Sequence, residues 1–208
     1  MRDLIILGTG VHAAEMAEIV GRVNCASPAW NLLGHVAHEA PGPGASFHGN
    51  PVLGTLDVLA RYPQAMLVPD NEFPRDALAA LPRDRFASLI DPTTFVSAAA
   101  RIGAGCVVYP HGFIGVNARM GDFVFALAGT VINHDNVIED RTVFASGTTL
   151  AGFVHVEAGC YLGQACSVKQ YVRIGRNSLI GMGAVVTKDV APFSVMVGNP
   201  ARKLRENR

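Results

Sequence analysis

The segment VINHDNVIEDRTVFASGTTL, from Val131 to Leu150, carries the pattern that decides the fold, an apolar residue at every sixth position. The pattern continues in both directions and occurs sixteen times without a break, at Val96, Ile102, Val108, Ile114, Met120, Ala126, Ile132, Ile138, Phe144, Leu150, Val156, Leu162, Val168, Ile174, Ile180 and Val186. A helix repeats about every 3.6 residues and a strand about every 2, whereas hexapeptide repeats are the sequence sign of a parallel β-helix. We therefore predict a solenoid in the C-terminal half.

Three six-residue repeats make one triangular coil in this architecture, so residues 18 positions apart, such as Ala126 and Phe144, stack on one face. The small Ala126 then lies directly below the bulky Phe144, which is the compensation of volumes that a densely packed interior needs. Stacked coils satisfy their backbone hydrogen bonds with their neighbours, so caps are needed only at the two ends. We expect the solenoid domain at residues 89–190 and a C-terminal tail at residues 191–208.

Residues 1–88 carry alternating strand and helix patterns, and we expect them to form a separate small domain. The first elements are a buried strand at 4–7, a tight turn at Gly8-Thr9-Gly10 and a helix at 11–22. Further on we expect a strand at 30–36, a loop at 41–51, a helix at 55–62, a strand at 65–68, a helix at 74–81 and a strand at 86–90. Such alternation indicates a small parallel sheet. The predicted fold is an α/β half-Rossmann domain followed by an all-β parallel β-helix.

The composition excludes two classes of partner. The 208 residues include 17 acidic and 17 basic side chains, so a formal net charge of zero gives no attraction to nucleic acid or to an anionic membrane. Near the N-terminus only Leu4 to Leu7 form an apolar run, which is too short for a signal peptide or a membrane span. We therefore expect a cytoplasmic protein with no membrane span and no nucleic-acid partner.

Four motifs give the chain a resemblance to a known family. They are Gly8-Thr9-Gly10-Val11-His12-Ala13, Asn133-His134-Asp135-Asn136-Val137-Ile138, Ile180-Gly181-Met182-Gly183-Ala184-Val185-Val186 and Gly198-Asn199-Pro200-Ala201. Together they resemble the left-handed β-helix acyltransferases, and within them the bacterial sialic acid O-acetyltransferases and nucleotide-activated amino-sugar N-acetyltransferases. The resemblance implies a left-handed solenoid, acetyl-CoA as co-substrate, and a homotrimer with its active site in a cleft between two subunits.

His134 is the candidate general base. Acyl transfer from a thioester needs a group that takes the proton from an attacking amine or hydroxyl, and a histidine titrates in the right range. His134 follows the inward Ile132 by two residues, on the outer part of the coil. The resemblance assigns the general base to the matching histidine and lets the acidic neighbour, here Asp135, hold the imidazole. Consecutive residues of a flat strand point to opposite faces, so this contact requires a bent backbone at a prism corner.

Simpler interpretations of this motif stay open. His134 is also compatible with a surface histidine that makes a hydrogen bond between coils, and Asp135 with a solvated carboxylate. Asn133 is a candidate for orienting the acceptor, although an amide that faces solvent fits equally well.

The turn at Gly8 and Gly10 is the candidate acceptor site, because it directs backbone N–H groups and a helix N-terminus toward any phosphate placed there. The spacing Gly8-x-Gly10-x-x-Ala13 fits a variant dinucleotide fingerprint, but the segment is only half a Rossmann fold and no acidic residue closes the second strand. A tight turn without a ligand is the alternative. The resemblance implies contacts with a nucleotide-sugar acceptor at Gly10, Val11, His12 and Gly54.

Two places depart from the family pattern. Ala37 and His38 stand where the family often has an acidic pair that holds the base or the ribose, which leaves the nucleotide open. Val143 replaces a second histidine, nine residues beyond the base, that touches the acetyl donor. Coenzyme A is still expected along the stacked coils. By resemblance the nearest positions are Gln164 and Met182, and the candidates for its phosphates are Lys188, Arg202 and Lys203.

The leading hypothesis is an acetyl-CoA-dependent transferase that acetylates an amino group of a nucleotide-linked amino sugar. One alternative is an O-acetyltransferase acting on sialic acid or another sugar hydroxyl, and another is a non-catalytic solenoid scaffold. A zinc hydration enzyme built on hexapeptide coils needs three converging histidines, two of them close in sequence, whereas His111, His134 and His155 lie 23 and 21 residues apart. We therefore expect no metal site.

Overall fold

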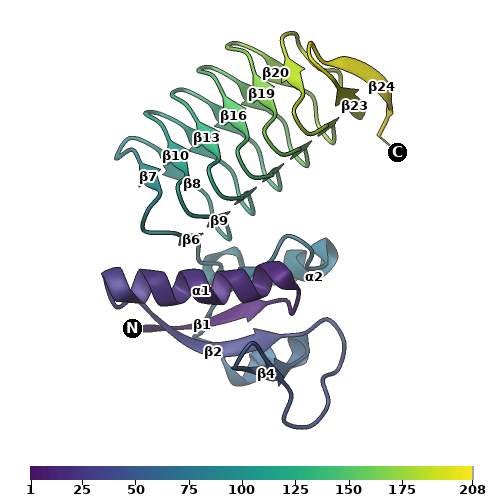
Figure 1. Cartoon of the computed structure of the whole chain (residues 1–208). Coiled ribbons are helices and arrows are strands. Elements are labelled where there is room, and N and C mark those ends of the chain that lie inside the picture. The colour runs from purple at the N-terminus through teal and green to yellow at the C-terminus, as the bar shows by residue number, and fades with distance from the viewer. Residues whose placement is uncertain (208) are drawn as a thin grey trace. The chain divides into compact units, whose positions relative to one another are not determined.

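A computed structural model describes residues 1–207 and divides the chain into two units, unit 1 from Met1 to Asp91 and unit 2 from Pro92 onward (Figure 1). Unit 1 is built from strands and helices, and unit 2 from short strands in stacked coils (Figure 1). No helix within residues 1–207 is long and apolar enough to cross a membrane.

Unit 1 is a small sheet with helical segments. Its elements are β1 (Arg2–Leu7), α1 (Val11–Ala26), β2 (Trp30–Val36), β3 (Ser46–Phe47), β4 (Asn50–Gly54), the 3-10 helix η1 (Leu56–Arg61), β5 (Met66–Pro69), α2 (Arg75–Ala79), the 3-10 helix η2 (Arg83–Arg85) and β6 (Leu89–Ile90). The sheet order is β3-β4-β2-β1-β5, and β1 runs parallel to both β2 and β5. The chain therefore leaves β1 toward one side for β2 and returns on the other side as β5.

The start of unit 1 follows the predicted strand, turn and helix. Residues Leu4 to Leu7 of β1 are all buried, as expected for a central strand. α1 buries Ala13, Met16 and Val20, which share one helix face at spacings of three and four. The helix continues to Ala26, four residues further than expected. It ends there because Ser27 precedes Pro28, and a residue before proline disfavours the helical conformation.

Three local expectations for unit 1 need correction. The segment expected as a loop at 41–51 overlaps the hairpin β3–β4, whose two-residue turn His48-Gly49 has positive φ at both residues, 45° and 78°. The helix expected at 55–62 is the 3-10 helix η1, and the helix expected at 74–81 is only the short α2, which ends before Pro82. The strand expected at 86–90 shrinks to β6, with one isolated bridge from Phe86 to Leu67.

Unit 2 is a parallel β-solenoid with three faces. Its strands are β7 (Phe95–Val96), β8 (Arg101–Ile102), β9 (Val107–Val108), β10 (Phe113–Ile114), β11 (Arg119–Met120), β12 (Phe125–Ala126), β13 (Val131–Ile132), β14 (Val137–Ile138), β15 (Val143–Phe144), β16 (Thr149–Leu150), β17 (His155–Val156), β18 (Tyr161–Leu162), β19 (Ser167–Val168), β20 (Arg173–Ile174), β21 (Leu179–Ile180), β22 (Val185–Val186), β23 (Ser194–Val197) and β24 (Arg202–Glu206).

The strands fall in rotation into three sheets, which we call faces 1, 2 and 3. Face 1 has the order β22-β19-β16-β13-β10-β7, face 2 the order β20-β17-β14-β11-β8, and face 3 the order β24-β23-β21-β18-β15-β12-β9. Paired residues are 18 positions apart, as Ile114 with Ile132 and Ile132 with Leu150. The predicted coil length and register are therefore correct.

The six-residue repeat forms the core of unit 2. Every repeat position from Val108 to Val186 is buried, whereas Val96 and Ile102 in the first coil are half-buried. Phe144 is 0% exposed and pairs with Ala126 on one side and Leu162 on the other. The small residue thus makes room for the large one in the neighbouring coil, as the pattern predicted.

Candidate active site

His134 lies at the corner where the chain passes from face 1 to face 2. β13 ends at Ile132 and β14 begins at Val137, and between them Asp135 adopts a left-handed conformation with φ of 58°. This bend brings Oδ2 of Asp135 to 2.9 Å from Nδ1 of His134. The contact between neighbours is therefore present, together with the bent backbone that it requires. The side chain of His134 is 50% exposed and so is open to a ligand.

Asp135 is held from two sides. Its Oδ2 faces the imidazole of His134, and its Oδ1 accepts a hydrogen bond of 3.0 Å from Nδ2 of Asn117 in the preceding coil. These bonds, the one with His134 first, hold the pKa of Asp135 below its ordinary value. In the tautomer that carries its hydrogen on Nδ1, His134 donates to this carboxylate, and Nε2 is then the ring nitrogen with a free lone pair.

The space beside the imidazole exists because residue 152 is a glycine. A Cβ on Gly152 would lie 2.5 Å from Cε1 and 2.6 Å from Nε2 of His134. Phe153 packs edge-on against the same ring, with centroids 5.2 Å apart, and Tyr171 stacks on Phe153 at 5.0 Å. Phe153 and Tyr171 are 43% and 70% exposed. The corner therefore presents an accessible imidazole beside two exposed aromatic rings.

The side chains of two asparagines connect this corner to the next coil by hydrogen bonds. Nδ2 of Asn133 donates to the carbonyl of Leu150 at 2.7 Å. Asn136 is fully buried, donates to the carbonyl of Asn133 at 3.1 Å and accepts the N–H of Val154 at 2.6 Å. The side-chain amide of Asn133 thus has a structural partner in the next coil.

The residues expected at the acetyl donor are spread over the solenoid. Gln164 and Met182 are exposed and follow β18 and β21, so they lie at the corner between faces 3 and 1. Val143 is half-buried in β15 on face 3, beside Tyr161. Only Lys188, which follows β22, is at the same kind of corner as His134. A single chain therefore does not bring Gln164 or Met182 to the corner of His134.

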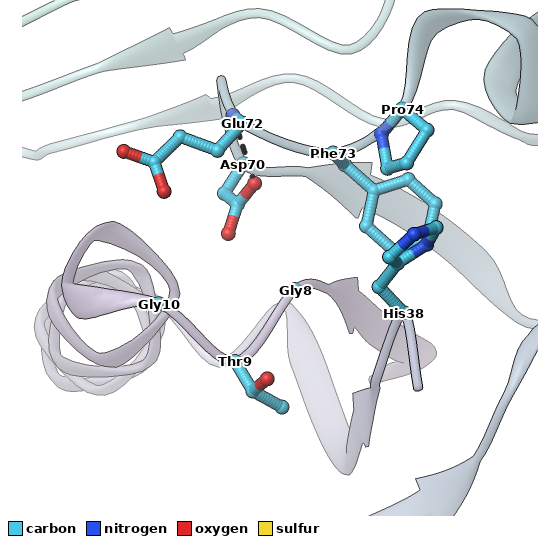
Figure 2. Close-up of a pocket in the computed structure, with 8 residues that line it drawn as sticks. All are labelled: Gly8, Thr9, Gly10, His38, Asp70, Glu72, Phe73 and Pro74. Atoms are coloured by element: carbon cyan, nitrogen blue, oxygen red, sulfur yellow. Dashed lines mark hydrogen bonds between the residues drawn. The ribbon is translucent and has the colours of Figure 1, made fainter. Parts of the chain in front are cut away.

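Unit 1 has a pocket of about 190 Å³ at the carboxyl ends of β1 and β5 (Figure 2). It is lined by Gly8, Thr9, Gly10, His38, Asp70, Glu72, Phe73 and Pro74. The pocket therefore includes two of the expected acceptor-binding residues, Gly8 and Gly10. Val11, His12 and Gly54 are outside this set, and Nδ1 of His12 lies 3.2 Å from Oε2 of Glu15.

Asp70 is the buried polar group of this pocket. Its side chain belongs to a residue that is 6% exposed, and its Oδ1 accepts the backbone N–H of Glu72 at 3.0 Å. Burial raises the pKa of Asp70 above its ordinary value, although hydrogen bonds from the backbone of Glu72 and Phe73 act against it. In Figure 2 the carboxylate is directed at the glycine turn.

Sequence reasoning missed several residues of these two places. Asn117 and Gly152 lie 17 and 18 residues from His134. The 18-residue stacking rule could therefore have found them and Phe153. Asp70 and Glu72 follow a short strand and belong to no motif, so no local signal connects them with the glycine turn.

No metal site is found within residues 1–207, where no group of three or more His, Cys, Asp or Glu side chains is placed to hold an ion. Cys106, Cys160 and Cys166 are buried thiols outside any disulfide, and burial raises the pKa of Cys160 and Cys166 to about 11. These thiols are packing residues of the coils.

Comparison with known proteins starts from sequence. No protein-family model matches the chain. The acyl-[acyl-carrier-protein]–UDP-N-acetylglucosamine O-acyltransferase of Pseudomonas aeruginosa is 40% identical over 82 residues, which are 39% of this chain and 32% of that protein. The protein of the same name from Synechocystis is 33% identical over 88 residues, 42% of this chain and 32% of its own length. The chain thus spans about a third of the length of these curated relatives.

Solved structures match over nearly the whole chain. A mutant of perosamine N-acetyltransferase from Caulobacter crescentus, in complex with CoA and GDP-perosamine, has a TM-score of 0.87 and 25% identity and covers 99% of this chain and 98% of its own. WeeI from Acinetobacter baumannii AYE has a TM-score of 0.83 and 26% identity over 98% of this chain and 100% of its own. The acetyltransferase domain of PglB from Neisseria gonorrhoeae FA1090 shares the fold, with a TM-score of 0.84 and 24% identity.

The fold and the comparisons define the class. The parallel β-solenoid matches the left-handed β-helix, and the relatives and structural neighbours are acyltransferases, so the predicted resemblance to the hexapeptide-repeat acyltransferases is confirmed. Within that class, the structures that match over nearly the full length include the acetyltransferase domain of PglB and an N-acetyltransferase solved with CoA and GDP-perosamine.

Proposed function

We propose that the protein transfers the acetyl group of acetyl-CoA to an amino group of a nucleotide-linked amino sugar, with His134 as the general base. The observation that carries this proposal is the pair of His134 and Asp135, 2.9 Å apart on an exposed corner of the solenoid. The full-length likeness to an N-acetyltransferase solved with CoA and GDP-perosamine supports the choice of donor and acceptor.

The proposed reaction uses the free Nε2 of His134. The amine nitrogen of the acceptor attacks the thioester carbonyl, and Nε2 takes the proton that the nitrogen loses as the new N–C bond forms. A backbone N–H stabilises the oxyanion of the tetrahedral intermediate. When the C–S bond breaks, the imidazolium returns the proton to the departing sulfur, which yields CoA and the amide. Asp135 orients the ring and stabilises its charged form, and a base of this kind contributes about 10²- to 10⁴-fold in rate.

Binding of the nucleotide part of the acceptor is assigned to unit 1. We infer that residues 1–88 act as a half-Rossmann, nucleotide-sugar-binding domain and that residues 89–190 carry the transfer. The parallel β1-α1-β2 arrangement and the pocket at the glycine turn support this division. The contacts proposed for the acceptor are made by Gly8, Gly10, Val11, His12, Gly54 and Asn133.

The donor site is proposed to lie between protomers. Coenzyme A is expected along the coils, at Val143, Gln164, Met182 and Lys188. Gln164 and Met182 lie at a different corner from His134, so a neighbouring protomer is the natural source of one side of the site. This separation supports the homotrimer that the family resemblance implies. A cytoplasmic location also stays a prediction.

O-acetylation of a sugar hydroxyl, with sialic acid as one acceptor, is the second candidate. The curated relatives are O-acyltransferases, the one from Pseudomonas aeruginosa being 40% identical over 82 residues, and that observation favours it. A histidine base serves an attacking hydroxyl as well as an amine. A non-catalytic scaffold is less favoured. A solenoid that only assembles does not need an exposed imidazole that is hydrogen-bonded to a carboxylate and has room beside it because residue 152 is a glycine.

A screen of acceptors tests the proposal. The protein is incubated with acetyl-CoA and a panel of nucleotide-linked amino sugars, each paired with the analogue that carries a hydroxyl in place of the amine, and products are analysed by mass. We expect the gain of one acetyl group on amino sugars only, in a product that resists hydroxylamine as an amide does. Acetylation of the hydroxyl analogues, with ester products that hydroxylamine cleaves, would instead support the second candidate. No acetylated product from any acceptor would contradict both.

A further inference from the structure

The pocket of unit 1 has the wrong charge for a phosphate. Asp70 and Glu72 both line it, and both carry acidic side chains. A Cβ on Gly8 would lie 2.0 Å from Oδ2 of Asp70, and one on Gly10 would lie 3.5 Å from Oε2 of Glu72, so the two carboxylates face the turn itself. A phosphate bound at the turn would lie next to both carboxylates. Their negative charges would repel it, because the pocket is partly shielded from water.

The donors that a phosphate would need are also partly taken. The N–H of Gly8 donates to the carbonyl of Val36 at 2.9 Å, inside the sheet. Gly8 has φ of 134°, a conformation that favours glycine, so the turn is shaped to admit the carboxylate of Asp70 rather than a side chain of its own. Together with the two carboxylates, this turn gives the pocket hydrogen-bond acceptors as its main polar groups.

The position of the pocket still marks it as a ligand site. In the order β3-β4-β2-β1-β5 the chain reverses direction across the sheet at β1, and ligands of open α/β sheets bind beyond the carboxyl ends of the strands at such a switch point. Gly8 follows β1 there, and Asp70 follows β5. The pocket of about 190 Å³ is smaller than the roughly 300 to 1,000 Å³ of sites for whole drug-sized ligands. It therefore suits one ring of a larger ligand.

We propose that Asp70, with Glu72 beside it, binds the ribose of the nucleotide-linked acceptor by accepting hydrogen bonds from its 2′- and 3′-hydroxyl groups. Vicinal hydroxyls supply two donors without a charge, and a carboxylate has two oxygens to receive them. Figure 2 shows the rings of His38 and Phe73 together on the side of the pocket away from Glu72, where they offer flat surfaces to the sugar or the base. The acceptor is thereby selected as a ribonucleotide, and the phosphates lie outside the pocket.

This assignment rests on the proposed function, and its test separates the two. Binding of the free nucleoside diphosphate, in its ribose and 2′-deoxyribose forms, is measured by calorimetry without acetyl-CoA, and acetyl transfer is measured with the matching pairs of acceptors. We expect the wild-type protein to prefer ribose over 2′-deoxyribose in both assays. In Asp70→Asn, binding of the ribose form and KM for its acceptor should weaken by about 10- to 100-fold, with kcat little changed.

Two further variants control for charge and folding. Asp76→Asn removes a nearby exposed carboxylate of α2 that does not line the pocket, and it should keep the wild-type preference. Glu72→Gln should weaken the preference less than Asp70→Asn does, because Glu72 is exposed whereas Asp70 is buried. An unchanged preference for ribose in a folded Asp70→Asn protein, or a preference that follows the base instead of the sugar, would overturn this inference and leave the proposed transfer standing. Nucleotide binding with the expected preference but no acetyl transfer would overturn only the proposed function.

Discussion

At the scale of single residues, the position of the His134 imidazole depends on Gly152 in the next coil. Gly152→Ala places a methyl group 2.5 Å from Cε1 of His134, so the ring must move away from its present place. A displacement of about 1 Å at a reacting group costs roughly 100-fold in rate, and we expect kcat to fall by that order while KM for acetyl-CoA changes little. Steady-state kinetics measure both parameters.

The control for this change is Gly21→Ala, because a Cβ on Gly21 meets no atom within 4 Å and the residue lies inside α1. Alanine in an exposed helix interior stabilises by about 1 kcal/mol relative to glycine, so this variant should keep full activity and unfold no more easily than wild type. Normal kcat in Gly152→Ala would show that the imidazole position is unimportant.

The ionisation of Asp135 depends on Asn117, which gives a prediction about pH. The hydrogen bonds of His134 and Asn117 keep the folded pKa of Asp135 below its ordinary value of about 3.9, so they stabilise the fold above that pH, and the contribution is lost as pH falls through the folded pKa. Asn117→Ala should therefore raise the pKa of Asp135 toward the ordinary value, as NMR titration of the carboxyl carbon reports. Asn31→Ala removes a similar bond to Asp3 instead and should leave Asp135 unaffected. An unshifted Asp135 in Asn117→Ala contradicts this account.

The residue scale also shows the reach of sequence reasoning. The contact of His134 with Asp135 followed from adjacency plus a bend, and both are local properties. The meeting of Asp70 with Gly8 depends on how β5 pairs with β1, at a sequence separation of 62 residues with irregular turns between them. No pattern of spacing contains that pairing, so the acidic character of the pocket could only come from the structure.

At the scale of elements, the fold rests on the match of large and small residues between coils. Phe144 is completely buried between Ala126 and Leu162, and Phe144→Ala should lower the free energy of unfolding by about 3 to 5 kcal/mol because it leaves a cavity. The matched control is Tyr161→Ala. Tyr161 is on the outer side of the neighbouring strand and is 44% exposed, so its loss should lower the free energy of unfolding much less. Denaturant unfolding measures both. Equal losses for the two variants would argue against the inward register.

Elements with a strict period were predicted closely, and elements with a short or irregular pattern were not. The coils repeat one geometry, so a single six-residue rule placed every strand from β7 to β22. The hairpin β3–β4 was missed because its strands are only two and five residues long and its His48-Gly49 turn is not among the strongest turn signals. The helix α2 lies between Pro74 and Pro82 and is shorter than expected. Helical spacing of apolar residues alone does not take account of such prolines.

At the scale of the whole molecule, the separation of His134 from Gln164 and Met182 predicts an assembly. The residues proposed for the donor and the proposed base lie at different corners of one solenoid, so the proposed site requires a second copy of the chain. We expect a mass in solution close to three times the 22.0 kDa of one chain, measured by light scattering on the purified protein. A monomer that is fully active at nanomolar concentration would contradict a shared site.

The central claim is that His134 is the base for acetyl transfer, and thiol release from acetyl-CoA in the presence of an acceptor tests it most directly. His155→Ala is the matched control, since Nε2 of His155 lies 2.8 Å from Oε1 of Glu139 in a second pair of histidine and carboxylate that no step of the mechanism uses. We predict that His134→Ala lowers kcat by about 10²- to 10⁴-fold and that His155→Ala leaves it close to wild type. Unchanged thiol release from a folded His134→Ala protein would contradict the account.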